Sequence, residues 1–133
     1  MKLTLLLAEA ATTHPDGTVS ILRAGINRAV NHSTPIPLSA ALVARVDGDV
    51  NEGGSSHKFA VRLFNEDGRD VIPKVEGGFV LPPEWGAVNL VFNLQAAFPK
   101  HGRYSFHLNV DDIHHAQWSV EVTPHPPRAP KTG

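Results

Sequence analysis

The sequence predicts an all-β domain, a two-sheet antiparallel β-sandwich of about eight strands with an immunoglobulin-like or jelly-roll-like arrangement. Three observations predict this fold. Apolar and polar residues alternate with a period of two along most of the chain, as in strands that bury one face. Clusters of Gly, Pro, Asn and Asp separate these runs and supply turns. Eleven Gly and eleven Pro among 133 residues leave little room for long helices.

The alternating runs give the predicted strands in chain order. They cover residues 3–8, 19–22, 25–30, 38–46, 58–63, 88–94, 103–110 and 116–123. The run at 38–46 is apolar on both faces until Arg45, which indicates a central strand, while Pro35 and Pro37 before it make a helix the alternative. We expect the domain to span residues 1–123. Residues 124–133 form a Pro-rich extended tail, because prolines interrupt any strand or helix there.

Composition argues against several classes of function. Lys and Arg number 12 against 13 for Asp and Glu, and a net charge of −1 gives no field to attract nucleic acid or an anionic membrane. The absence of cysteine removes disulfides, thiol nucleophiles and Cys-bound metals. The opening "MKLTLLLAEAATT" predicts a first strand rather than a signal peptide, because Glu9 ends its apolar run early. We expect a soluble, cytoplasmic protein that binds neither nucleic acid nor membrane.

The stretch "GRYSFHLNVDDIHHAQWSVEV" predicts a late hairpin. Gly102 and Tyr104 fit a tyrosine corner, in which the Tyr hydroxyl ties back to the preceding corner. With residues 111–115 as the loop, Leu108 faces Trp118 and each inward residue meets an inward apolar partner. We expect four structural residues here: Gly102, Tyr104, Phe106 and Trp118.

One polar connection carries the residue types of a calcium loop. Asp47, Asp49 and Asn51 hold the first, third and fifth positions, where oxygen ligands alternate toward the ion. Glu52 then stands where the loop needs Gly, and Lys58 where it needs a bidentate Glu. These departures favour a flexible connection between strands.

The hairpin tip is the second candidate for a metal site. Asp112 and His114 have the i, i+2 spacing that places two side chains on one side of an extended chain. His114 and His115 are adjacent and point apart, and His107 lies too far from the tip to complete a coordination shell. We therefore expect no metal and no cofactor. The metal candidates that we retain are Asp47, Asp49, Asn51, Asp112 and His114.

Nucleophilic catalysis is not favoured. Ser55, Ser56 and His57 follow one another, but a catalytic Ser needs a strained turn and a base that the fold positions, and no G-x-S-x-G is present. No glycine-rich phosphate loop leads into a helix. We expect that the protein is not an enzyme. Trp85 in "LPPEWG" is interpreted as a plug at the open end of the sandwich, with an exposed binding aromatic as the alternative.

The N-terminal leucines are the candidate interface. Leu3, Leu5 and Leu7 fall on one face of the first strand and Leu6 on the other. An edge strand would expose the second face, so either this strand is central in its sheet or another subunit covers it. We keep a homodimer through these four residues as a hypothesis.

The order of motifs resembles a family of small bacterial and actinophage proteins that carry only a domain-of-unknown-function label. The segments that carry the resemblance are "KLTLLLAEAA", "DGTVSILRAGINR", "HKFAVRLFNEDG", "LPPEWG", "HGRYSFHLNVDD" and "WSVEV". The resemblance extends to about Thr123 and leaves out the tail. It implies the sandwich fold and no catalytic residues.

Three functions agree with these observations. The first is a non-enzymatic binding or assembly module that acts through self-association and a protein partner. The second is a structural or accessory component of a larger assembly, such as a phage particle. The third is a small-ligand or metal-binding module that uses residues 47–52 or 111–115. Exposed apolar patches would favour the first two, and convergent carboxylates the third.

Overall fold

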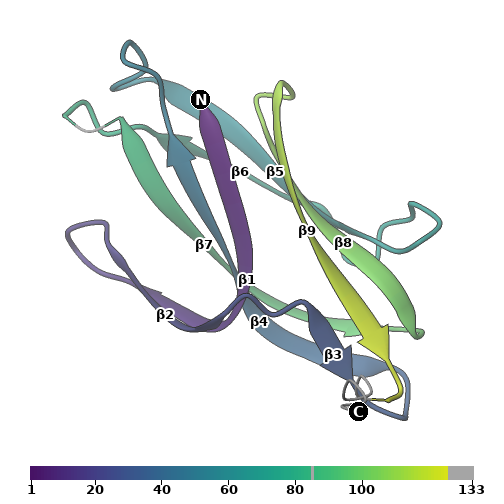
Figure 1. Ribbon diagram of the computed structural model, residues 1–133. Helices are drawn as coiled ribbons and strands as arrows, with labels where there is room; N and C mark the ends of the chain where they lie inside the picture. Colours follow the sequence, from purple (N-terminus) through teal and green to yellow (C-terminus); the bar gives the residue numbers. More distant parts are fainter. Residues whose placement is uncertain (85, 126–133) are drawn as a thin grey trace, which may run out of the picture.

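The computed structural model describes residues 1–84 and 86–125 and contains nine strands in two packed sheets (Figure 1). The strands are β1 (Lys2–Thr13), β2 (Val19–Ala24), β3 (Arg28–Val30), β4 (Ile36–Asp47), β5 (Ser56–Phe64), β6 (Val75–Val80), β7 (Ala87–Phe98), β8 (Gly102–Val110) and β9 (His114–Thr123). Sheet A has the order β2-β1-β4-β7, and sheet B has the order β3-β9-β8-β5-β6. The prediction of an all-β sandwich is confirmed. The ladders are antiparallel except β3–β9, which is parallel.

The core lies between the two sheets and is made by the inward rows that the period-two pattern predicts. The largest fully buried side chains are Phe98, Phe106, Leu7, Leu42, Leu63, Leu81 and Leu108. None of the described polar or charged residues is fully buried. Burial of apolar surface is therefore the main stabilising contribution inside the sandwich.

β4 settles the choice between strand and helix at residues 38–46. It pairs with β1 on one side and with β7 on the other along its length. Leu42 points to the core at 0% exposure, and Val43 on the opposite face is also buried, at 6%. A central strand with two covered faces explains why this run is apolar on both parities.

β6 is the strand that the pattern did not predict. Its sequence, VEGGFV, has no alternation because of Gly77 and Gly78. A Cβ atom at Gly77 would lie 2.5 Å from the ring of Phe59, so glycine lets this ring cover the neighbouring strand. A glycine pair is typical of a turn, but here it lies within a strand and makes room for a ring of the neighbouring strand.

The β8–β9 hairpin forms with a register two residues away from the predicted one. Val110 pairs with His114 and Phe106 with Trp118, so the turn contains only residues 111–113. Asp111 and Asp112 have positive φ angles of 55° and 57°, which Asp tolerates better than most residues, and this permits the tighter turn. A shift of two keeps every side chain on its predicted face, so the apolar pattern could not distinguish the two registers.

The four predicted structural residues lie at the corner and core of this hairpin. The hydroxyl of Tyr104 donates to the carbonyl oxygen of Lys100 at 2.7 Å, and Phe106 is fully buried. A Cβ at Gly102 would lie 3.0 Å from Oε1 of Glu66. Trp118 is half-buried against the core, and its Nε1 donates to the carbonyl oxygen of Ile26 at 2.7 Å.

The N-terminal leucines are not a free surface. β1 lies between β2 and β4, and Leu5 and Leu7 are 7% and 0% exposed in the chain's own core. Leu3 packs against that core, and Leu6 is half-buried on the other face of β1. The hypothesis of an interface through these four residues is therefore corrected. The strand is central, and the chain itself provides the cover.

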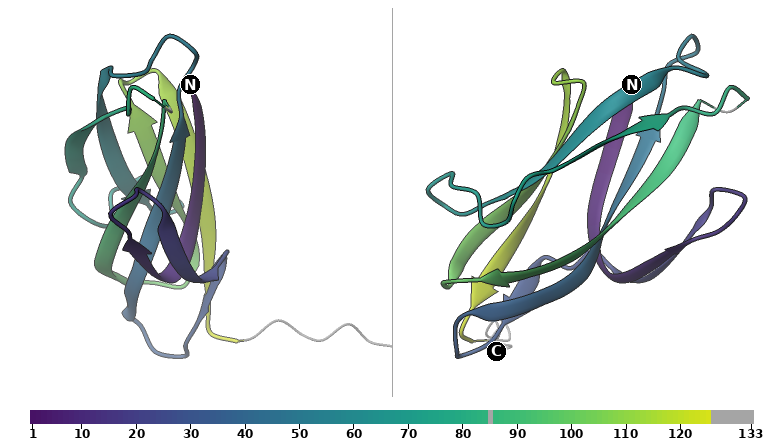
Figure 2. Two further views of the ribbon diagram at one scale, coloured as in Figure 1. Left: turned by 90° about the vertical axis from the view of Figure 1, so that its left-hand side faces the viewer. Right: turned by 180° about the vertical axis from the view of Figure 1, so that it is seen from behind.

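The second half of β1 and β2 form a hairpin that projects from sheet A and contacts Asn89 of β7 through Gly17 at its tip; we call it the arm (residues 8–24; Figure 2). Ile21 and Leu22 on β2 are 40% and 58% exposed, although they point to opposite faces. The predictions for Trp85 and for the tail beyond His125 lie outside the described residues. Across residues 1–84 and 86–125 no helix has the length and apolarity needed to cross a membrane.

Candidate functional site

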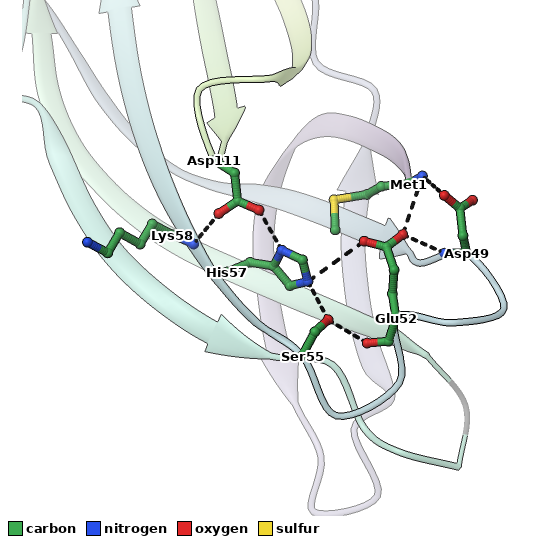
Figure 3. Close-up of polar contacts among 7 residues, drawn as sticks. All are labelled: Met1, Asp49, Glu52, Ser55, His57, Lys58 and Asp111. Carbon is green, nitrogen blue, oxygen red and sulfur yellow. Dashed lines mark hydrogen bonds and ion pairs between the residues drawn. The ribbon is translucent and has the colours of Figure 1, made fainter.

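The most connected polar group gathers where the β4–β5 loop meets the β8–β9 turn (Figure 3). His57, at the start of β5, is its centre, and its side chain is 9% exposed. Its Nδ1 lies 2.6 Å from Oδ2 of Asp111, and its Nε2 lies 2.7 Å from Oγ of Ser55. The ring stacks on Phe79 with centroids 5.4 Å apart. One imidazole thus joins two loops that are 54 residues apart in the chain.

The direction of each hydrogen bond determines the chemistry open to Ser55, His57 and Asp111. The Ser55 hydroxyl donates its hydrogen to the carbonyl oxygen of Glu52. Nε2 of His57 contacts the same hydroxyl oxygen, and Nδ1 faces the Asp111 carboxylate, which accepts when ionised. In a Ser-His-Asp hydrolase the imidazole instead accepts the serine proton. The arrangement joins the two loops through His57, and we call it the clasp.

Asp111 is the anionic partner in this clasp. Its Oδ1 accepts the backbone N–H of Lys58 at 2.9 Å, and its own N–H donates to the carbonyl oxygen of Lys58 at 2.8 Å. The hydrogen bond from His57 and the N–H of Lys58 lower the pKa of Asp111 below its ordinary value. Asp111 lies in the candidate loop 111–115 but was not named as a site residue, because nothing in local spacing links it to His57.

The calcium-type loop does not gather its oxygens around one point. Asp47 accepts from Nε of Arg45 at 3.1 Å. Asp49 lies 2.9 Å from the Met1 ammonium, whose hydrogen bond lowers the pKa of this carboxyl. The two carboxylates are thus engaged with different cations, and Asn51 is exposed beside them. Within the described ranges, no three His, Cys, Asp or Glu side chains are grouped to hold a metal ion.

The hairpin residues are arranged differently from the prediction. Asp112 is exposed on the turn, and His114 lies on β9 opposite Val110 rather than at the tip. His115 also belongs to β9, and its Nε2 lies 2.7 Å from Nδ1 of His107. The sequence analysis placed His115 in the loop and did not predict this contact with His107. The contact forms because the observed register places His115 on β9.

The comparisons with known proteins give a family and no activity. Searches of curated proteins and of solved structures returned no match. Residues 3–123 match the model of a family described as a family of unknown function, DUF6941. This range covers the nine described strands apart from Lys2, the first residue of β1, and ends where the predicted tail begins. The chain therefore belongs to the DUF6941 family.

Proposed function

We propose that this protein is a cytoplasmic assembly module, without catalysis of its own, that self-associates through the free edge of β7. One observation carries the proposal. β7 is a twelve-residue edge strand, AVNLVFNLQAAF, with no charged residue and no proline. Among the described strands it pairs only with β4, which leaves one side of its backbone open. A long, uncharged edge is a template for another strand.

The other edge strands carry features that discourage pairing. β2 contains Arg23, and β3 has three residues, including Arg28. β6 contains Glu76 next to the pair Gly77 and Gly78. Charge, short length and glycine are the usual means by which sheets protect their edges. β7 lacks all three, so it is the edge best suited to an interface.

The sandwich is also open along the first half of β7. Leu90 and Phe92 face inward but are only half-buried, whereas Leu94 and Phe98 further along are 7% and 0% exposed. A strand added beside residues 87–93 would cover the two half-exposed side chains. The hydrophobic gain from this burial adds to the backbone hydrogen bonds of the new ladder.

A second copy of this chain is the occupant that fits. An antiparallel β7–β7 pair around a two-fold axis sets like faces opposite each other, and no register brings like charges together because the strand has none. The net charge of −1 gives little repulsion between copies. Joining two four-stranded sheets A in this way forms one continuous sheet.

The position of the arm also favours an interface at the free edge of β7. It extends past β7 in both views, and Nδ2 of Asn89 on β7 donates to the carbonyl oxygen of Gly17 at the arm's tip at 3.0 Å (Figures 1 and 2). A strand added to β7 would lie beside the arm and its exposed Ile21 and Leu22. A two-stranded ribbon alone is marginal in water, so contact with a second copy would stabilise it.

The test is the solution mass by light scattering. Asn93 and Gln95 are exposed on the outer face of β7, and Asn93→Lys with Gln95→Lys places ammonium groups near one another across the two-fold axis. We expect a dimer for the native chain and a monomer for this double variant. Ser119→Lys, on the exposed face of β9, is the control for added charge and should remain dimeric. A monomeric native chain at high concentration, or a double variant that stays dimeric, contradicts the proposal.

A further inference from the structure

The outer face of sheet B holds a pair of histidines that belongs to neither the His57 clasp nor the β7 edge. Nδ1 of His107 on β8 faces Nε2 of His115 on β9 at 2.7 Å. The two rings are nearly parallel, with an angle of 25° and centroids 5.0 Å apart. Both residues lie on the face opposite the core row of Tyr104 to Val110, so the facing nitrogens are on the surface of the sheet.

The backbone holds this pair in place. β8 and β9 are joined by a ladder in which His107 pairs with Gln117 and Asn109 with His115, so the two rings meet diagonally. β8 is also paired with β5 on its other side. Two side chains on adjacent paired strands keep their separation without an entropic cost for bringing distant loops together. The pair is therefore preorganised.

A neutral ring is favoured at His107. A hydrogen bond between two imidazoles requires that one of the facing nitrogens carries no proton. Burial, His115 and the nearby Arg62 together lower the pKa of His107. None of the ion pairs among the described residues includes His107 or His115. Neutral imidazole is the form that ligates metals.

We propose that His107 and His115 form a two-histidine site for a divalent late transition-metal ion, with Cu²⁺ bound most tightly and Ni²⁺ and Zn²⁺ after it. Two nitrogen ligands without carboxylate or thiolate select these ions over Mg²⁺ and Ca²⁺. One ion at about 2.0–2.1 Å from each nitrogen holds them about 3 Å apart. The observed 2.7 Å needs only a small rotation of the exposed His115 ring.

Water completes the coordination shell, and the surroundings limit the affinity. Arg62 on β5 is the cation that acts on His107, and its guanidinium is paired with Asp70 at 2.6 Å. Phe64 covers one side of the His107 ring at 4.9 Å between centroids. On β9 the nearest neighbour in the ladder is the neutral Gln117. Binding by two ligands on an open face is reversible, which suits exchange of the ion rather than a permanent structural role.

The experiment is a Cu²⁺ titration of the full chain without an affinity tag, followed by calorimetry and by electron paramagnetic resonance. We expect one site that binds more strongly than any other on the chain, with two bound imidazole nitrogens in the spectrum. His115→Ala should weaken binding by about tenfold or more and leave one imidazole nitrogen. Lowering the pH from about 7.5 to about 5.5 should weaken it in the native chain, because protons compete with the metal ion for imidazole nitrogen.

Other histidines provide the controls. His32 and His125 also have their rings in contact, but edge-on at 70° and 5.6 Å, so His32→Ala should leave Cu²⁺ binding at His107 and His115 unchanged. His107→Ala should match His115→Ala, with far-ultraviolet circular dichroism confirming that both variants fold. Equal affinities for the native chain and His115→Ala, or an equal loss in His32→Ala, would overturn the proposal. The site is on sheet B and β7 on sheet A, so dimer formation can fail without affecting this result.

Discussion

The half-buried side chain of Trp118 contributes to stability in two ways. Its ring packs against the core, and its Nε1 donates to the carbonyl oxygen of Ile26, which precedes β3. Trp118→Phe keeps most of the packing but leaves that carbonyl without its donor, so we expect a loss of about 1–2 kcal/mol in the free energy of unfolding. Trp118→Ala removes the packing as well and should cost about 3 kcal/mol. Urea unfolding measures both, and a phenylalanine variant as stable as the native chain would show that the hydrogen bond contributes nothing.

The candidate residues also show where sequence reasoning ends. Tyr104 and Phe106 were predictable because a corner motif and a period of two are local patterns. His57 and Asp111 were not, since only the fold brings residues 54 positions apart to 2.6 Å. His107 and His115 were misjudged for a smaller reason, a register that differs by two. Contacts between side chains require the register, which the pattern of faces leaves open.

The clasp joins two elements, the β4–β5 loop and the β8–β9 turn, and its contribution to the stability of the fold should depend on pH. The pKa of Asp111 is lowered in the folded state, mainly by the hydrogen bond from His57. A lowered pKa stabilises the fold above the range where a free aspartate titrates, about 3.9, and this contribution is lost as the pH falls through the lower folded value. Asp111→Asn should therefore destabilise the protein near neutral pH by about 1 kcal/mol and lose this effect in acid.

Asp112→Asn is the matched control for that prediction. It makes the same change of charge one residue away, on an exposed position with almost the same φ angle, 57° against 55°. Melting temperatures of the two variants, measured from neutral to acidic pH, should differ at neutral pH and converge as the pH falls. Parallel curves for the two variants would contradict a specific clasp at Asp111.

The strands themselves were largely predictable, and the exceptions have physical causes. β4 and β8 follow their apolar patterns because each strand lies inside a sheet. β6 was not predicted, because the ring of Phe59 leaves room only for glycine at position 77. The sequence of β6 therefore reflects a contact with another strand instead of the alternation of two faces. The arm was predicted in part: the run at 19–22 lies in β2, whereas residues 9–13 of β1 were not predicted, because they are mostly exposed and lack the alternation that burial imposes.

For the whole molecule, self-association predicts a stability that depends on concentration. If two copies pair through β7, folding is linked to assembly, and the melting temperature should rise with protein concentration. The Asn93→Lys, Gln95→Lys variant should melt at a temperature independent of concentration, because the charged edge no longer pairs. Calorimetry over a wide range of concentrations measures this. A native melting temperature that stays constant would argue against a linked dimer.

The parallel ladder between β3 and β9 bears on the timing of folding. Arg28 pairs with Glu121 and Val30 with Thr123, so sheet B closes only after nearly the whole domain has been synthesised. Ladders between such distant segments form slowly, because a long loop must close before any contact rewards it. During that delay β7 and its apolar inner row are exposed in the nascent chain. The edge proposed to join two finished copies is thus also the segment that most needs chaperone protection while the chain is incomplete.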